Sequence, residues 1–313
     1  MSERPFDVLL IGELNVDLIL SGSVPMRLGQ VETLVDDMAL CAGSSSAIFA
    51  SSASKMGLSV AFCSVIGDDL FGHYVLGALR DAGVDTRHVA VDPSLKTGVT
   101  VVLDTGDDRG MLTYGGSMTR VSAELLPSDW TCLAHHLHVA SPFLLDALRP
   151  DLSRLMRLAR EAGVSVSVDT NWDPQEAWDV DDLLEHTDIL LPNEAELRAL
   201  ARIDDLDAAL AQMAERVPVI AVKCGAEGSR AASRTDRAQV AAYPVQSVST
   251  TGAGDTFDGA FIAAWLRGQP LARCLRIANV AGALTTTQVG GFNGQPTWCE
   301  AQRLAGAHNW STV

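Results

Sequence analysis

The stretch TTGAGDTF, residues 250–257, combines two glycines with a carboxylate just ahead of an apolar segment. Apolar residues then recur at the spacing of one helix face, namely Phe257, Phe261, Ala264 and Trp265. Gly252 and Gly254 therefore fall at a helix N-terminus, where unpaired N–H groups and the helix dipole attract an anion. A lone aspartate such as Asp255 usually complements the dipole there. Two neighbouring glycines, however, open the backbone further than a plain helix start requires.

A carboxylate beside a bound anion is electrostatically unfavourable unless it takes part in a reaction. Phosphoryl transfer is such a reaction, because it needs a base that accepts a proton from a hydroxyl and donors that neutralise the phosphate. Asp255 and the glycine turn offer these two properties. The chain contains no GxxxxGK[ST] motif, which excludes a P-loop enzyme, and no GxGxxG motif, which disfavours a nucleotide-dependent oxidoreductase.

The composition indicates an acidic globular protein. Of the 313 residues, 47% are hydrophobic, and the formal net charge is −16. Such a chain lacks the basic face that nucleic acid or an anionic membrane requires, so neither is expected as a partner. The six cysteines form no CxxC pair, the N-terminus has no signal-peptide pattern, and no run of 18 apolar residues is present. We therefore expect a cytoplasmic protein.

Two kinds of segment alternate along the chain. Apolar, β-branched runs typical of strands buried on both faces of a parallel sheet occupy residues 6–12, 60–67, 136–142, 164–170, 188–193 and 217–225. Helix-period segments lie between them at residues 47–57, 74–83, 152–163 and 194–202. Several of these end in a glycine suited to a C-cap. The alternation predicts an α/β fold with a doubly wound, mostly parallel sheet sandwiched by helices.

Two stretches depart from this rhythm, at about residues 14–40 and 97–116. They have the pattern of a few antiparallel strands, the second being a hairpin with its turn at TGDDRG, residues 105–110. No internal repeat or flexible linker separates them from the rest. We therefore expect one domain over residues 1–313, with a small β-sheet lid beside the main sheet.

The glycine turn, extended to TTGAGDTFDGAF, resembles the C-terminal signature of the ribokinase-like, or pfkB, family of carbohydrate kinases. Eight further segments match in order: GELNVD (12–17), IGDDLFG (66–72), LRDAGVD (79–85), TGVTVVLD (97–104), DTN (169–171), LPNEAE (191–196), KCGAEG (223–228) and ANVAGALTTTQVGG (278–291). The resemblance implies a ribokinase-like fold that transfers the ATP γ-phosphoryl group to a sugar or nucleoside hydroxyl with Mg²⁺. It also implies a homodimer formed through the lid.

The resemblance assigns roles to the glycine turn and to one residue beyond it. Asp255 would be the base that takes the proton from the accepting hydroxyl. The N–H groups of Gly252, Ala253 and Gly254 would form the anion hole. Asn279 matches a position that lines the adenine pocket.

Two further segments match the nucleotide and metal region of the family. Asn193 and Glu196 match an NxxE motif that acts on the phosphate region and the Mg²⁺. Without the resemblance, the same pair would be an ordinary helix cap with an exposed acid. Lys223, Gly225 and Gly228 match the nucleotide-binding loop, although the two glycines alone would be turn glycines.

Asn15 and Asp17 follow the first strand and match residues that hydrogen-bond sugar hydroxyls. Such a pair can accept from two hydroxyls at once and would reject analogues that lack them. Without the resemblance, they would be a polar pair at a strand end. Gly43 matches the glycine that lets a substrate approach the backbone.

The substrate side departs from the family pattern. Ser44 and Ile48 replace a glycine and an asparagine of the second signature, and Ala140 stands where ribokinases carry a sugar-contacting glutamate. Ser249 replaces an aspartate, which leaves the need for a monovalent cation open. YGGS, residues 114–117, lacks the arginine expected in kinases of keto-deoxy sugar acids. A neutral polyol, furanose or nucleoside is therefore the expected substrate.

Other readings of the chain stay open at this point. A nucleoside kinase of the same family is one alternative to a sugar kinase, and a sugar-binding regulatory protein that has lost catalysis is another. Asp255 disfavours the second of these, whereas Ile48 and Ser249 leave it open. His136 and His138 would share one face of a strand, but no carboxylate or cysteine at ligand spacing supports a metal site there.

Overall fold

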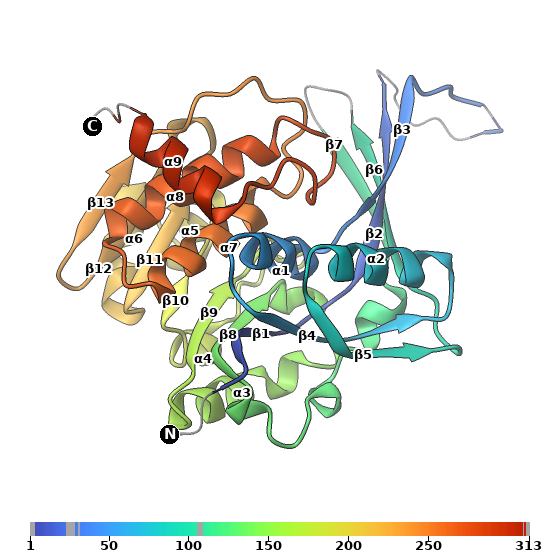
Figure 1. Ribbon diagram of the computed structural model, residues 1–313, viewed down its shortest axis with the longest axis horizontal. Coiled ribbons are helices and arrows are strands. Elements are labelled where there is room, and N and C mark those ends of the chain that lie inside the picture. The colour runs from blue at the N-terminus through green and yellow to red at the C-terminus, as the bar shows by residue number, and fades with distance from the viewer. Residues whose placement is uncertain (1–3, 23–28, 31, 105–108, 309, 311–313) are drawn as a thin grey trace.

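The computed structural model describes residues 4–22, 29–30, 32–104, 109–308 and 310, and its main feature is a nine-stranded sheet. The strand order is β13-β12-β11-β10-β9-β8-β1-β4-β5 (Figure 1). The strands are β1 (Phe6–Ile11), β4 (Val60–Gly67), β5 (Asp85–Asp92), β8 (Ala134–Ala140), β9 (Ser165–Asp169), β10 (Ile189–Leu190), β11 (Val219–Lys223), β12 (Ser229–Ser233) and β13 (Arg237–Val240). All are parallel except β12 and β13, which close one edge in antiparallel pairing.

Successive apolar side chains of each strand point to opposite faces of this sheet. Both faces are therefore apolar, and helices cover both of them. On β1, Val8 and Leu10 join one core cluster, and Leu9 and Ile11 join the other. The first cluster is covered by α1 (Ser45–Lys55), α2 (Leu70–Asp81), α7 (Ala253–Leu266), α8 (Leu271–Thr285) and α9 (Trp298–Ala307). The second is covered by α3 (Arg149–Glu161), α4 (Asp181–Leu184), α5 (Glu194–Ala201) and α6 (Leu206–Arg216). The doubly wound sandwich predicted from the sequence is confirmed.

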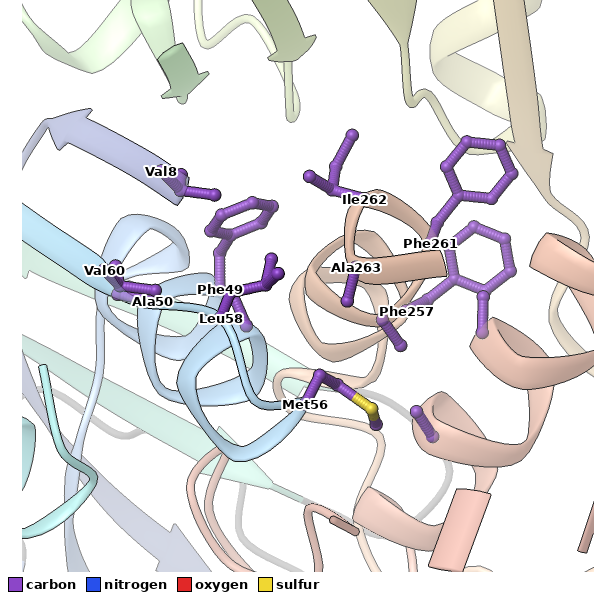
Figure 2. Close-up of a cluster of buried hydrophobic side chains, with 14 of the residues drawn as sticks. Val8, Phe49, Ala50, Met56, Leu58, Val60, Phe257, Phe261, Ile262 and Ala263 are labelled. Carbon is purple, nitrogen blue, oxygen red and sulfur yellow. The ribbon is translucent and has the colours of Figure 1, made fainter. Parts of the chain in front are cut away.

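Helix α7 is buried more completely than its sequence pattern predicts. One apolar face was expected, but every residue from Thr256 to Ala264 is buried. Figure 2 shows Ile262 on the side of α7 that faces Phe49 of α1, and Phe257 and Phe261 on the other side of the helix. Because α1 and α8 pack on different sides of α7, even its polar and small residues are shielded from solvent.

A smaller four-stranded sheet projects from one end of the main sheet (Figure 1). Its order is β3-β2-β6-β7, with β2 (Asn15–Ser21), β3 (Asp37–Ala42), β6 (Gly98–Asp104) and β7 (Arg109–Tyr114). The pairs β2–β3 and β6–β7 are antiparallel, as expected, but β2 and β6 pair in parallel. Residues 105–108 of the expected hairpin turn lie outside the described residues. This sheet agrees with the predicted lid.

The sequence located the other elements with uneven accuracy. The six predicted strands and four predicted helices are present, although β10 has only two residues. Glycines follow three of these helices with positive φ, for example Gly57 (80°) and Gly163 (74°). Strand β5 and the antiparallel edge were missed. In the described part of the chain, no helix has the length and apolarity needed to cross a membrane. Short 3₁₀ helices occupy Gly116–Arg120, Ala123–Leu125, Trp130–Cys132, Pro142–Leu144 and Gly225–Glu227.

Candidate active site

Polar groups meet at the carboxyl ends of the parallel strands. Asn15 follows β1, Asp169 ends β9, Asn193 follows β10 and Lys223 ends β11. The chain reverses its direction of winding around β1, since β4 and β5 lie on one side of it and β8 to β11 on the other. In open α/β sheets, such a switch point forms a crevice suited to ligands.

The N-terminal turn of α7 is built from backbone rather than side chains. Gly252 is the N-cap with φ 74°, and no side chain caps the helix. A Cβ on Gly252 would lie 2.5 Å from the Cα of Gly291, so a larger residue cannot occupy this position without displacing the loop. The Ala253 N–H makes a long contact of 3.4 Å with the Thr250 carbonyl, and no side chain competes with an anion for the first N–H groups of α7.

Asp255 lies in the first turn of this helix, next to those N–H groups. Burial and the nearby Asp169 carboxylate raise its pKa to about 6, although the Lys223 ammonium and a hydrogen bond from Ser45 act in the opposite direction. A carboxylate with this pKa is ionised at neutral pH and is still basic enough to accept a proton from a hydroxyl in a transition state. The geometry thus suits general-base chemistry.

Asn193 and Glu196 form a capping box at the start of α5. The Asn193 N–H donates to Glu196 Oε2 at 2.8 Å, and the Glu196 N–H donates to Asn193 Oδ1 at 2.9 Å. The ordinary cap considered above is therefore present, but its acid is buried at 4% exposure rather than exposed. Burial and the Asp169 charge raise the pKa of Glu196 to about 7.

Lys223 stands between two buried carboxylates. Its Nζ donates to Asp169 Oδ2 at 2.8 Å and to Asp258 Oδ2 at 2.9 Å. Asp169 and Asp258 are 2% and 1% exposed, respectively. Neither was assigned a role from the sequence, although DTN was one of the matching segments and Asp258 follows Asp255 by one helical turn. Only the fold brings β9, β11 and α7 together at this point.

The residues at this edge of the sheet fit a divalent cation that completes its shell with phosphate oxygens. Asp169, Glu196, Asp255 and Asp258 carry four carboxylates around a single lysine, and the pKa values of the last three are raised. Among the described residues, no group of three or more His, Cys, Asp or Glu side chains is arranged to hold a metal alone. Mg²⁺ typically takes one or two protein carboxylates together with substrate phosphates. Asp169 ends β9, and Glu196 lies in the first turn of α5, which follows β10.

A cavity of about 490 Å³ lies beside this charged edge. Four residues predicted from the sequence to bind the nucleotide line it: Lys223, Gly225, Gly228 and Asn279. Asn193 lies outside the lining. A Cβ on Gly228 would overlap the carbonyl of Val240, so this position requires glycine. Asn279 Nδ2 donates to the Val240 and Ala241 carbonyls at 3.2 and 2.9 Å, which fixes one wall.

Asn15, Asp17 and Gly43 meet where the small sheet joins the main domain. Asn15 Nδ2 donates to Asp17 Oδ1 at 3.1 Å and to Thr100 Oγ1 at 3.2 Å. A Cβ on Gly43 would overlap the Asp17 carboxylate, so this glycine is needed for the carboxylate to lie there. The structure thus brings the three predicted substrate residues together and adds Thr100 of β6.

Glu13 is a buried acid that the sequence analysis missed. It lies between β1 and β2 at 2% exposure, and burial raises its pKa to about 7 despite hydrogen bonds from Ser44 and Ser46. Ser44 has a positive φ of 74°, where the family pattern has glycine, and its Oγ donates to the Glu13 carbonyl at 2.6 Å. This hydroxyl also accepts from the Ala47 N–H and so caps α1. An acid within the apolar GELNVD run was the signal available in the sequence.

The other departures from the family pattern are packed into the site. The Ile48 side chain packs against Gly252 and Gly291 and so contacts the glycine turn directly. Ala140 is 2% exposed at the end of β8, opposite Asp169 in the register. Ser249 is buried, and its N–H donates to the Thr286 carbonyl at 3.0 Å.

His136 and His138 share one face of β8, as expected, and form a hydrogen-bonded chain with two serines. Ser165 Oγ lies 2.8 Å from His136 Nδ1, and Ser167 Oγ lies 2.7 Å from both His136 Nε2 and His138 Nδ1. His138 also stacks on Phe49 with ring centroids 3.5 Å apart. Burial lowers the pKa of His136 to about 3 and lowers that of His138 as well. These imidazoles are neutral groups of the core.

Comparisons with known proteins bear on the family and the fold. The profile of the pfkB family carbohydrate kinases matches residues 6–298. The chain is 30% identical over 283 residues to probable fructokinase-5 from Arabidopsis thaliana, covering 84% of this chain and 87% of that protein. It is 27% identical over 299 residues to ribokinase from Haemophilus influenzae, covering 92% and 94%. Arabidopsis thaliana ribokinase complexed with ribose and ATP superposes with a TM-score of 0.83 at 25% identity, covering 97% of this chain and 99% of that chain.

Proposed function

The chain belongs to the pfkB family of carbohydrate kinases, and from this premise we propose that Asp255 activates a hydroxyl of a neutral sugar for attack on the γ-phosphoryl group of ATP. The observation that carries the proposal is the position of Asp255. Its carboxylate lies in the first turn of α7, and the two residues before it, Ala253 and Gly254, line the large cavity. A base, an anion site and room for a nucleotide are the parts that phosphoryl transfer needs.

Each group in the site has a distinct task in the proposed reaction. Asp255 takes the proton of the hydroxyl as its oxygen bonds to the γ-phosphorus. The N–H groups of Gly252, Ala253 and Gly254 stabilise the negative charge on the transferred group. Asn15 and Asp17 orient the sugar through its other hydroxyls, and Gly43 leaves them room.

The nucleotide side is proposed in the same way. ATP occupies the cavity lined by Gly225, Gly228 and Asn279, with its phosphates directed toward the N-terminus of α7. Asn193 fixes the carboxylate of Glu196 through the capping box. Glu196 and Asp169 would hold Mg²⁺, which neutralises phosphate charge when it is bound.

The substrate is a neutral sugar or a nucleoside in this proposal. The Asp17 carboxylate favours hydroxyl donors and repels an acidic or phosphorylated sugar. Fructose and ribose are the first candidates, because relatives named fructokinase and ribokinase match most of the chain. Ser249 supplies no carboxylate, so turnover is expected without an added monovalent cation. A cytoplasmic location stays a prediction.

We further propose that the small sheet is the lid of a single domain and the interface of a homodimer. Met38, Leu112 and Tyr114 lie on one face of it with 57%, 53% and 56% of their surfaces exposed. Side chains of this kind gathered on one face are typical of an interaction surface.

Incubation with ATP, Mg²⁺ and a panel of neutral sugars, sugar acids and nucleosides tests the proposal. We expect ADP and a phosphate ester, identified by mass spectrometry, with at least one neutral sugar and with no sugar acid. Thermal-shift measurements on the same panel separate the alternatives, because a ligand stabilises the folded state by mass action. A sugar that shifts the melting temperature without any transfer would favour a regulatory protein, and transfer to nucleosides alone would favour a nucleoside kinase.

A further inference from the structure

The Lys223 side chain is placed at the meeting point of the nucleotide cavity and the anion hole. It lines the cavity together with Ala253 and Gly254. A Cβ built on Gly254 would lie 3.6 Å from Lys223 Nζ, so the ammonium rests against the turn that carries the open N–H groups. The Lys223 ammonium is therefore within van der Waals range of the glycine turn.

The ammonium is held in this place by two carboxylates that leave one of its donors unused. Lysine has three N–H donors. Within the described structure, Nζ donates to Asp169 and Asp258 only, at 2.8 and 2.9 Å. The third donor belongs to a side chain that borders the cavity and is 13% exposed. It is thus available to an oxygen of a group that enters the cavity.

Asp258 is only partly satisfied by the fold, although it forms an ion pair with Lys223. It is 1% exposed, and its Oδ1 has no hydrogen-bond partner among the described residues. A buried carboxylate oxygen without a partner lowers the stability of the fold. Its other oxygen is fully used, because Oδ2 accepts from Lys223. Asp258 and Asp255 are three residues apart and lie on the same side of α7.

The geometry points to a role for this pair that deepens the proposed function and rests on it. Lys223 donates to an oxygen of the transferred γ-phosphoryl group, and Asp258 is the positioning residue that holds its ammonium beside Gly254. In the reaction, the acceptor oxygen bonds to the γ-phosphorus, the bond to the β,γ-bridging oxygen breaks with its electron pair leaving on ADP, and Asp255 receives the proton. Lys223 stabilises the charge on the moving group because its ammonium is already in place.

Nucleotide binding tests this role without knowledge of the sugar. Calorimetric titrations with Mg²⁺ would compare ADP with the non-hydrolysable ATP analogue AMP-PNP, which carries the additional phosphoryl group. We expect Lys223→Met to weaken AMP-PNP binding tenfold or more and to leave ADP binding within about twofold. Asp258→Asn should reproduce most of this selective loss, and the double variant should be no weaker than Lys223→Met alone, since Asp258 acts through Lys223.

A matched control is available at another ion pair. Asp207→Asn removes one carboxylate from the exposed pair between Arg230 and Asp207 and should change neither affinity. If Asp258→Asn does not fold, Asp258→Ser provides the same comparison with a shorter side chain. Equal loss of ADP and AMP-PNP, or no loss, would overturn the role of Lys223, and wild-type affinities in both Asp258 variants would overturn that of Asp258. A wild-type protein that binds neither nucleotide would instead refute the proposed function.

Discussion

Ser165, Ser167 and Asp169 lie on one face of strand β9 but belong to two different polar clusters. The two serines form a neutral hydrogen-bonded chain with His136 and His138 of β8. We call these four residues the neutral chain. Burial lowers the pKa values of both histidines, so no charge is present to be desolvated at neutral pH.

Two residues further along the same face, Asp169 belongs to a charged cluster with Glu196, Lys223, Asp255 and Asp258. Here four acids surround one ammonium, and the pKa values of Glu196 and Asp255 are raised to about 7 and 6. The neutral chain satisfies its polar groups and stabilises the fold. The charged cluster contains more negative charge than the fold can neutralise, which is expected where cations and a phosphate bind. The comparison predicts that substitutions in the cluster affect turnover, whereas those in the chain affect stability.

The largest effect is expected for Asp255→Asn in the charged cluster. The amide cannot accept the hydroxyl proton, so turnover should fall roughly 10²- to 10⁴-fold, the usual contribution of a general base. Steady-state kinetics with ATP and the accepting sugar would measure this. ATP binding should be kept, and the melting temperature above pH 6 should rise slightly, because the variant removes a buried charge whose pKa is raised. Unchanged turnover would show that Asp255 is not the base.

A smaller loss is expected for Glu196→Gln. Glutamine can keep the capping box of α5, but it removes one negative charge from the proposed Mg²⁺ site. The Mg²⁺ concentration that gives half-maximal activity should rise about 10- to 100-fold, while thermal unfolding changes little. As a control, Asp205→Asn alters another N-cap, that of α6, and should leave the Mg²⁺ dependence unchanged. A wild-type Mg²⁺ profile for Glu196→Gln would remove Glu196 from the metal site.

The pH dependence of the reaction offers a third test of the charged cluster. Asp255 must be ionised to act as base, and its pKa is about 6 in the free protein. At saturating Mg²⁺, which keeps Glu196 ionised, the value of kcat/KM for the sugar should therefore be level at neutral pH and fall tenfold per pH unit below a midpoint near 6. Bound Mg²⁺ would move the midpoint lower, because a cation favours the carboxylate. A midpoint near pH 8 would contradict the assignment, and the residual activity of Asp255→Asn should lack this acid limb.

The smallest effect on activity is expected for Ser167→Ala in the neutral chain. This change removes the hydroxyl that lies 2.7 Å from both imidazoles and leaves buried nitrogens unpaired. The free energy of unfolding should fall by about 1–3 kcal/mol, while turnover per folded molecule stays the same. Denaturant unfolding and kinetics on the same sample would measure both quantities. Ser165→Ala, which loses one imidazole partner, should cost less. A loss of turnover at full stability would mean that the chain serves the reaction.

Sequence reasoning worked best for features that lie within a few neighbouring residues. The turn from Gly252 to Asp255 is continuous, so its glycines, its acid and the following apolar spacing could be read together. The capping box of Asn193 and Glu196 spans one helical turn and was recognised for the same reason. The doubly wound sheet followed from the alternation of strand and helix patterns, which depends on local periodicity.

Sequence reasoning failed where the interacting residues come from elements that are distant in the sequence. Asp169, Lys223 and Asp258 stand 54 and 35 residues apart along the chain and meet only through the sheet. Asp258 falls outside the apolar spacing of Phe257, Phe261 and Ala264, which gives no reason to expect its burial, yet every residue of α7 from Thr256 to Ala264 is buried. Glu13 was overlooked because the serines that contact it lie more than 30 residues later.

The amino-acid sequence by itself therefore determined the kind of sheet, the glycine turn that begins α7 and the family, because each depends on local patterns or on the order of short motifs. Only the tertiary structure decided which carboxylates share a lysine, which acid is buried beside the cap and which histidines are neutral. Those properties depend on burial and on charges only a few ångströms away, and the fold sets both by bringing strand ends and a helix terminus together.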